Sequence, residues 1–265
     1  TPTTPTPILS GLVGSEMCIR DSPTFALAML LGQDFPKIEF DFMGLTLLEP
    51  NALITDFIMG AFSLYFAIKL RRNKEEHGFL KYWYYFFLFY GLGSLFGGLG
   101  HAFYYYTGPQ GKFPTWISGI LAAYFIEKAM IKSASGLNKN NRLGKIAFVK
   151  MILVFLIVIT VISTKAYQLD HKIGFIPIAI NTLIGVFISV ASISLYNMKR
   201  GCVNFKYLLY GVLIMAPSFF VFMFKFNPAQ WFDKSDLSHI IIIFGITLFY
   251  VGLKKLNYQG APFKD

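Results

Sequence analysis

Residues Lys81 to Thr107 read KYWYYFFLFYGLGSLFGGLGHAFYYYT, and they determine how the rest of the chain is interpreted. The stretch is long enough to cross a bilayer, because about 20 apolar residues suffice for a membrane-spanning helix. Its middle is rich in glycine, which would weaken a helix in water. In lipid, small residues about four positions apart let a neighbouring backbone approach closely. The stretch therefore predicts a tightly packed central helix of a membrane bundle, with His101 near its end.

The composition of the whole chain is typical of a membrane protein. Of its 265 residues, 55% are hydrophobic and 14% are charged, and the mean hydropathy is +0.53. Soluble domains have about 45–50% apolar and about 25% charged residues. We ascribe the formal charge of +10 to basic loops of a membrane protein, because no basic run interleaved with aromatic residues indicates nucleic-acid binding. We expect no nucleic-acid partner and no soluble partner.

The first 22 residues, TPTTPTPILSGLVGSEMCIRDS, differ in character from the rest of the chain. They resemble a translated adaptor string of the kind found at the ends of frames from assembled environmental sequence. The alternative is a disordered head rich in Thr and Pro. With either interpretation they are left out of the fold prediction. We expect four parts, namely this head (1–22), an N-terminal segment (23–50), a membrane domain (51–256) and a cytoplasmic tail (257–265).

Seven hydrophobic stretches are long enough to span a membrane, so the sequence predicts an all-α, multi-pass bundle of seven transmembrane helices. Basic residues concentrate in alternate linkers, which places the N-terminus outside and the C-terminus in the cytoplasm. Seven spans put the two ends on opposite sides, in agreement with this charge bias. The expected spans are approximately residues 52–70, 82–106, 115–133, 146–165, 173–196, 206–224 and 237–253.

This topology places polar residues from three spans at one outer level. Span one carries Asp56 near its outer end, and span two runs outward to His101. Span seven runs inward from Asp236 and His239. Ser94 lies seven residues before His101, and therefore close to two turns deeper on the same helical face. Ionisable groups in membrane spans are costly and often functional, so this level is the candidate site.

A purely structural interpretation competes with this one. All of these groups lie within about two turns of a helix end, where interfacial water lowers the cost of a polar group. Asp236 at a helix start is an ordinary cap or dipole partner. Glu49, directly before Pro50, is typical of a helix entry, because Pro is tolerated in the first turn.

Three short motifs resemble the ceramidase-like proteins of the CREST superfamily of seven-span membrane hydrolases, which includes alkaline ceramidases and relatives of the adiponectin receptors. EPNALITDFIMGAF (Glu49 to Phe62) is similar to the opening of their first span. GLGSLFGGLGHAF (Gly91 to Phe103) is similar to their second span, and SHIIIIFG (Ser238 to Gly245) to the start of their last. We place the resemblance in an uncharacterised bacterial branch, which implies a bacterial inner membrane and membrane lipid as the partner.

The resemblance implies a zinc site and a hydrolytic activity. In that family three histidines bind zinc, a serine and an aspartate assist, and zinc-bound water attacks an amide or ester. Zinc lowers the pKa of such a water toward about 7. Carried over, His101 and His239 are the expected metal ligands, with Asp236, or else Asp56, completing the set. Ser94 and Asp56 are the expected catalytic residues.

The chain departs from the family pattern in ways that bear on function. Ser235 stands where the other histidine of the last-span pair is expected, and Gly97 stands where the serine is expected. The missing ligand favours a degenerate, non-catalytic member of the fold that binds lipid or acts as a receptor. A zinc-dependent hydrolase of a lipid amide or ester is the alternative. A small-solute transporter is a third interpretation, although the chain has no inverted repeat.

Overall fold

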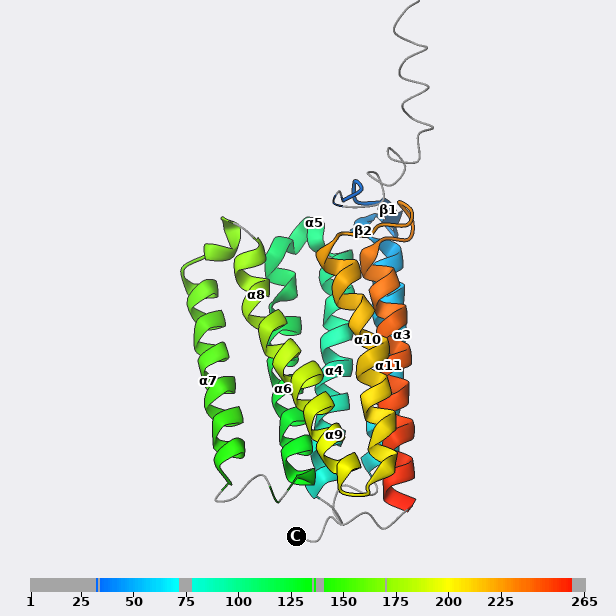
Figure 1. Cartoon of the computed structure of the whole chain (residues 1–265). Helices are drawn as coiled ribbons and strands as arrows, with labels where there is room; N and C mark the ends of the chain where they lie inside the picture. The colour runs from blue at the N-terminus through cyan, green and yellow to red at the C-terminus, as the bar shows by residue number, and fades with distance from the viewer. Residues whose placement is uncertain are drawn as a thin grey trace, which may run out of the picture.

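The computed structural model describes residues 34–71, 78–134, 141–169 and 171–258, together with Gly32 and Gly136, and these form a bundle of long helices (Figure 1). The separate head predicted at residues 1–22 lies outside the described residues, as does the predicted tail beyond Tyr258. The elements in chain order are β1 (Glu39–Phe42), β2 (Leu45–Leu48), α3 (Pro50–Leu70), α4 (Gly78–Ala102), α5 (Tyr104–Thr107), η2 (Gly108–Lys112), α6 (Phe113–Ser133), α7 (Arg142–Ser163), η5 (Ala166–Gln168), α8 (His171–Thr182), η6 (Leu183–Ser189, a π-helical stretch), α9 (Val190–Lys199), η7 (Val203–Phe205), α10 (Lys206–Met223) and α11 (Lys234–Tyr258).

The predicted membrane-type helical fold is confirmed in its main feature. Within the described residues, five helical stretches are long and apolar enough to cross a membrane, and they cover 50–70, 142–163, 173–199, 203–223 and 234–256. A sixth span arises only if α4 and the following helices through Ser133 count together, and these are bent by 80° at their junction. The number seven and the orientation in the membrane stay predictions.

A small β-hairpin precedes the helices and departs from the all-α prediction. Strands β1 and β2 pair antiparallel, with Glu39 opposite Leu48 and Phe42 opposite Leu45. Met43 and Gly44 form the two-residue turn, both with positive φ (52° and 81°). Positive φ at both central residues is the signature of the tight hairpin turn that matches strand twist. The hairpin leads directly into α3.

Glycine allows α3 and α4 to pack closely, as the sequence predicted for the central stretch. A Cβ placed on Gly60 would lie 3.1 Å from the carbonyl oxygen of Gly91, and a Cβ on Gly91 would lie 3.1 Å from that of Gly60. A second helix pair repeats the arrangement, since a Cβ on Gly211 of α10 would lie 2.9 Å from the carbonyl oxygen of Gly245 on α11. Small residues facing each other in this way are a common basis of helix association in membranes.

The distribution of apolar side chains also fits a membrane protein. A large core unites α3, α4, α6, α9, α10 and α11, and a smaller one joins α6, α7 and α8. Many large apolar side chains of α7 nevertheless face outward, among them Ile146, Leu153 and Leu156, each more than half exposed. Carboxylates such as Asp56 and Asp236 are buried instead. Exposed apolar surface over buried acids is expected where lipid is the solvent.

The two ends of the bundle differ in the elements that form them. The hairpin end carries β1, β2, α5 and the α10–α11 connection, at the top of Figure 1. The basic end carries the last turns of α3, α6, α9 and α11 and the first turns of α4, α7 and α10, at the bottom of Figure 1.

Candidate functional site

The hairpin holds Glu49 at the mouth of the bundle. The backbone N–H of Glu49 donates to the carbonyl oxygen of Ile38 (2.9 Å), and its own carbonyl accepts from Leu53 N–H (3.1 Å) in the first turn of α3. Glu49 has left-handed backbone angles (φ 51°, ψ 59°). Such a conformation costs free energy outside glycine and persists only when its surroundings enforce it. The hairpin and α3 therefore fix the direction of the Glu49 side chain.

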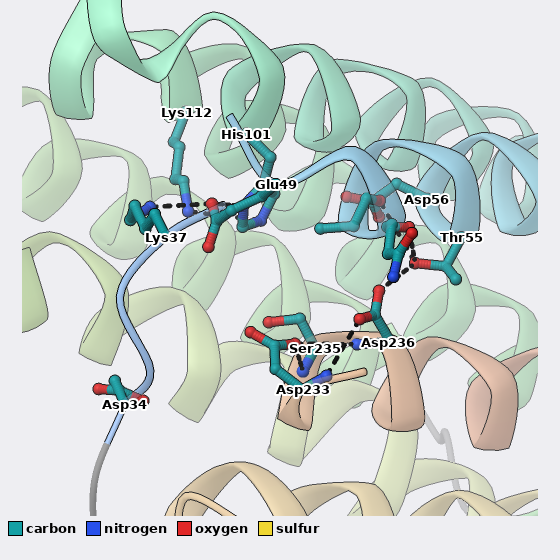
Figure 2. Close-up of polar contacts among 12 residues, drawn as sticks. Asp34, Lys37, Glu49, Thr55, Asp56, His101, Lys112, Asp233, Ser235 and Asp236 are labelled. Carbon is teal, nitrogen blue, oxygen red and sulfur yellow. Dashed lines mark hydrogen bonds and ion pairs between the residues drawn. The ribbon is translucent and has the colours of Figure 1, made fainter. Parts of the chain in front are cut away.

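Glu49 is the centre of a first group of charges, the Glu49 cluster, formed with Lys37, His101 and Lys112 (Figure 2). Glu49 Oε2 lies 2.7 Å from His101 Nδ1 and accepts a hydrogen bond from Lys37 Nζ at 2.8 Å. Lys112 Nζ lies 3.5 Å from His101 Nε2, on the other side of the ring. Burial raises the pKa of Glu49, but the hydrogen bonds from His101 and Lys37 and their charges outweigh it and hold that pKa well below its ordinary value.

A fold-back after α4 explains how Lys112 reaches His101. The chain bends between α4 and α5, and Gly108 (φ 54°) and the following proline start η2. A Cβ on Gly100 would lie 2.8 Å from the carbonyl oxygen of Gly111, so the returning backbone passes directly over the end of α4. Lys112 is the last residue of η2 and thus lies beside the last turn of α4.

A second group, the Asp56 cluster, joins α3 to α11 through Thr55, Asp56, Asp236 and His239. The Thr55 hydroxyl lies 2.9 Å from His239 Nδ1 and 3.2 Å from Asp236 Oδ1. Asp56 Oδ1 lies 3.5 Å from His239 Nε2. Figure 2 shows Thr55, Asp56 and Asp236 together, apart from the Glu49 cluster. Both carboxylates are almost fully buried, at 4% and 3% exposed.

Glycines of α4 make room for the Asp56 carboxylate. A Cβ on Gly97 would lie 3.1 Å from Asp56 Oδ2, and a Cβ on Gly98 would lie 3.1 Å from Asp56 Cβ. Gly97 stands where the resemblance would place a serine. A serine there would bring its Cβ against the Asp56 carboxylate.

Asp236 also caps α11, as the structural interpretation expected. Asp236 Oδ2 accepts from Asp233 N–H (3.1 Å), while Asp233 Oδ1 accepts from the N–H groups of Ser235 (2.7 Å) and Asp236 (3.3 Å). This reciprocal pattern is a capping box. One oxygen of Asp236 therefore closes the start of α11, and the other faces Thr55. The nearby Asn51 amide donates to the carbonyl oxygen of Trp231, which ties α3 to the α10–α11 connection.

The structure brings four of the five predicted site residues to one end of the bundle but divides them between two clusters. His239, Asp236 and Asp56 belong to one, and His101 belongs to the other. Ser94 lies deeper in α4, where its hydroxyl donates to the carbonyl oxygen of Tyr90 (3.0 Å), one turn away on the same helix.

The described residues do not fit the zinc site that the resemblance implies. They contain no group of three or more His, Cys, Asp or Glu side chains arranged to hold a metal ion. Each ring nitrogen of the two histidines already has a protein neighbour: Glu49 and Lys112 for His101, and Thr55 and Asp56 for His239. A zinc ligand needs one ring nitrogen directed at the metal. We therefore derive no chemistry through zinc.

Sequence reasoning missed Thr55, Lys37 and Lys112. Thr55 is adjacent to Asp56, and a hydroxyl one position from a buried acid gives no periodic signal. Lys112 lies in a linker outside the strongly basic set, so the charge pattern did not single it out. One feature of the sequence could have indicated Lys112: it follows a Gly-Pro pair in the short linker between two apolar stretches. Glu49 was recognised, but as a helix entry rather than as the partner of His101.

Comparison with known proteins adds one finding. No curated protein and no solved structure matches the chain. One family model matches residues 51–258, which include both clusters except Lys37 and Glu49. Because that model covers most of the 265 residues, the chain belongs to the family described as a family of unknown function, DUF6962.

Proposed function

We propose that the protein is a non-catalytic, CREST-like membrane protein that binds the negatively charged head group of a membrane lipid at its hairpin end. In this proposal seven helices cross the membrane, the N-terminus lies outside and the C-terminus lies in the cytoplasm of a bacterial cell. The basic linkers at the opposite end support this orientation. The Glu49 cluster then lies at the level of the outer leaflet's head groups.

The observation that carries the proposal is the position of Lys112. Its ammonium group is half-buried and faces the His101 ring at 3.5 Å. In the described part of the chain, no carboxylate lies within ion-pair distance of Lys112, whereas the neighbouring Lys37 is paired with Glu49. A partly desolvated cation is stabilised when an anion joins it. A phosphate or carboxylate of a ligand would supply that anion.

The surface beside the two clusters favours a lipid over a water-soluble anion. On α3, Ile54, Phe57 and Ile58 are 55%, 39% and 44% exposed, and they flank Asp56 in sequence. On α4, Phe96 and Leu99 are each 39% exposed, within two turns of His101. An amphipathic ligand could place its head at Lys112 and its acyl chains along these apolar faces.

The same site argues for binding rather than hydrolysis. The histidines that would hold zinc in a hydrolase have protein partners at both ring nitrogens, and Ser94 is bonded within its own helix. The metal content of protein purified in detergent without chelator tests this choice. About one zinc per chain, lost in both His101→Ala and His239→Ala, would overturn the non-catalytic proposal.

Lipid retention tests the binding proposal directly. Native mass spectrometry would count dioctanoyl phosphatidylglycerol molecules held per chain, with the zwitterionic phosphatidylcholine analogue for comparison. We expect Lys112→Gln to lower the affinity for phosphatidylglycerol at one site about tenfold, a loss of about 1.4 kcal/mol. Lys165→Gln is the matched control, because Lys165 is an exposed lysine at the same end. Equal retention by the two variants would contradict the proposal.

A further inference from the structure

Six described basic side chains at the basic end lie over tyrosine rings. Within the described residues, Lys150 pairs with Glu127 at this end of the bundle. The other contacts place a cation within about 6 Å of a ring centroid, close enough for cation–π attraction. They are Lys69 over Tyr65 (5.3 Å), Lys128 over Tyr82 (5.7 Å), Arg200 over Tyr196 (5.5 Å), Lys254 over Tyr250 (6.0 Å), and both Lys206 and Lys255 over Tyr207 (5.6 and 4.2 Å).

Tyr207 is distinctive because two ammonium groups converge on its ring. Lys206 is its neighbour in the first turn of α10, and Lys255 comes from the last turns of α11 and also donates to the Tyr207 hydroxyl. The Asn204 side chain donates to the carbonyl oxygen of Lys255 (3.2 Å). A Cβ on Gly252 would lie 2.9 Å from Tyr207 Cβ, so α10 and α11 are in close contact here. The fold thus brings the three residues to one place.

This convergence leaves positive charge without an internal counter-charge. In the described residues, neither Lys206 nor Lys255 lies within ion-pair distance of a carboxylate, and their charges repel each other. An anion located between the two ammonium groups would remove the repulsion and form two charge-assisted hydrogen bonds.

The depth of the site indicates what the anion is. The candidate spans run from 203 to 223 and from 234 to 256, so Lys206 and Lys255 lie at the very ends of two adjacent spans. That is the level of lipid phosphates at a membrane surface. One and two turns further along α10, Tyr210 and Leu213 are 48% and 57% exposed, and they offer an apolar face to acyl chains.

We propose that Lys206, Tyr207 and Lys255 form a binding site for the phosphate of an anionic phospholipid in the leaflet at the basic end. The two ammonium groups hold the phosphate oxygens, and the Tyr207 ring keeps the ammonium groups together. The site lies at the opposite end of the bundle from Lys112 and is independent of the function proposed above.

The test compares two double variants of the full chain that remove the same charge. Lys206→Gln with Lys255→Gln removes the site, while Lys145→Gln with Lys199→Gln removes two exposed basic-end lysines that lie over no ring in the described structure. Native mass spectrometry counts dioctanoyl phosphatidylglycerol per chain. We expect the first double variant to bind this lipid at one site at least tenfold more weakly than wild type, and the second to bind within about twofold of wild type.

Three further outcomes distinguish a lipid site from a generally basic surface and from a site for a free anion. Tyr207→Phe should weaken binding only about threefold, because the ring that positions the lysines remains. Equal weakening by both double variants would overturn the proposal and indicate general attraction to a basic surface. Displacement of the lipid by millimolar inorganic phosphate would also overturn it, by indicating a site for a free anion.

Discussion

The two ends of the bundle differ in how many of their lysines pair with acids. At the hairpin end, three lysines pair with carboxylates: Lys37 with Glu49 (2.8 Å), and Lys225 (2.7 Å) and Lys234 with Asp34. Two of them also lie over a ring, Lys37 over Tyr104 (4.3 Å) and Lys234 over Phe222 (5.8 Å). At the basic end, the described lysines mostly lie over tyrosine rings. The ion pairs of the hairpin end join segments far apart in the chain, for example Asp34 to residues near 230.

This difference indicates that a lysine paired with an acid mainly stabilises the fold, whereas a lysine without an acid partner is available to bind a ligand. An acid that links the N-terminal segment to α4 or to the α10–α11 connection stabilises the fold and leaves its lysine little charge to offer a partner. A lysine over a tyrosine ring keeps its full charge and is held in place at low cost. We therefore expect loss of a paired acid at the hairpin end to change stability, and loss of Lys206 and Lys255 at the basic end to change lipid binding. Lys112, which lies beside His101 and has no acid partner in the described residues, is the hairpin-end lysine whose loss we expect to change lipid binding.

The largest expected effect is from Glu49→Gln, which removes the carboxylate shared by His101 and Lys37. Glu49 is only 17% exposed, so its loss leaves a largely buried imidazole beside Lys112 without an acid. We expect a loss of about 3 kcal/mol in the free energy of unfolding, measured by thermal or denaturant melting in detergent. Glu39→Gln on the exposed face of β1 is the matched control and should stay within about 0.5 kcal/mol. If Lys255→Gln destabilised the protein as much as Glu49→Gln, the expected difference between the two ends of the bundle would be wrong.

Acid should remove the same stabilisation. Because the pKa of Glu49 is held below its ordinary value of 4.5, its contribution is fully present above that pH and declines as the pH falls below it toward the folded-state pKa. We expect the difference in melting temperature between wild type and Glu49→Gln to be constant from pH 7 to about pH 5 and to shrink below pH 4.5. A difference that stays constant down to pH 3 would contradict a stabilising role of the ionised carboxylate.

Thr55→Val tests the Asp56 cluster, and we expect it to lower the free energy of unfolding somewhat less than Glu49→Gln does. The substitution keeps the side-chain volume but removes the hydroxyl that lies near both His239 and Asp236. Leaving these groups without that contact should cost about 2 kcal/mol. Thr160→Val on α7 is the control, because the Thr160 hydroxyl is exposed and bonds only to the Leu156 carbonyl of its own helix (2.8 Å).

The sequence predicted the helices well because each depends mainly on local hydrophobic length. The expected span 52–70 compares with α3 at Pro50–Leu70, and 206–224 with α10 at Lys206–Met223. Span two was predicted at 82–106, whereas α4 covers Gly78–Ala102. The chain bends after Ala102 so that the backbone at Gly111 passes over Gly100, and the amino-acid composition does not mark this bend.

The sequence predicted at which end of the bundle the candidate residues lie, but not which of them contact each other. Helix direction alone brings Asp56, His101 and His239 to one end, and this was correct. Which acid meets which histidine depends on helix rotation and on the hairpin that positions Glu49, and neither is encoded in spacing. The lysine beside His101 depends on the fold-back in η2, which joins residues eleven apart through a tertiary contact.

Ser94→Ala is the smallest expected effect and distinguishes the resemblance from the structure. The Ser94 hydroxyl donates to Tyr90 in its own helix (3.0 Å), so its removal should change stability by less than about 0.5 kcal/mol. Ser63→Ala is an informative comparison, because that fully buried hydroxyl crosses from α3 to the Phe87 carbonyl of α4 (2.8 Å) and its loss should cost about 1 kcal/mol. If Ser94 instead assists hydrolysis, Ser94→Ala would abolish a lipid-amidase activity of the wild type while Ser63→Ala would retain it. Such a result would indicate that the protein is a hydrolase with Ser94 of α4 at its active site, and not a lipid-binding protein with its site at the hairpin end.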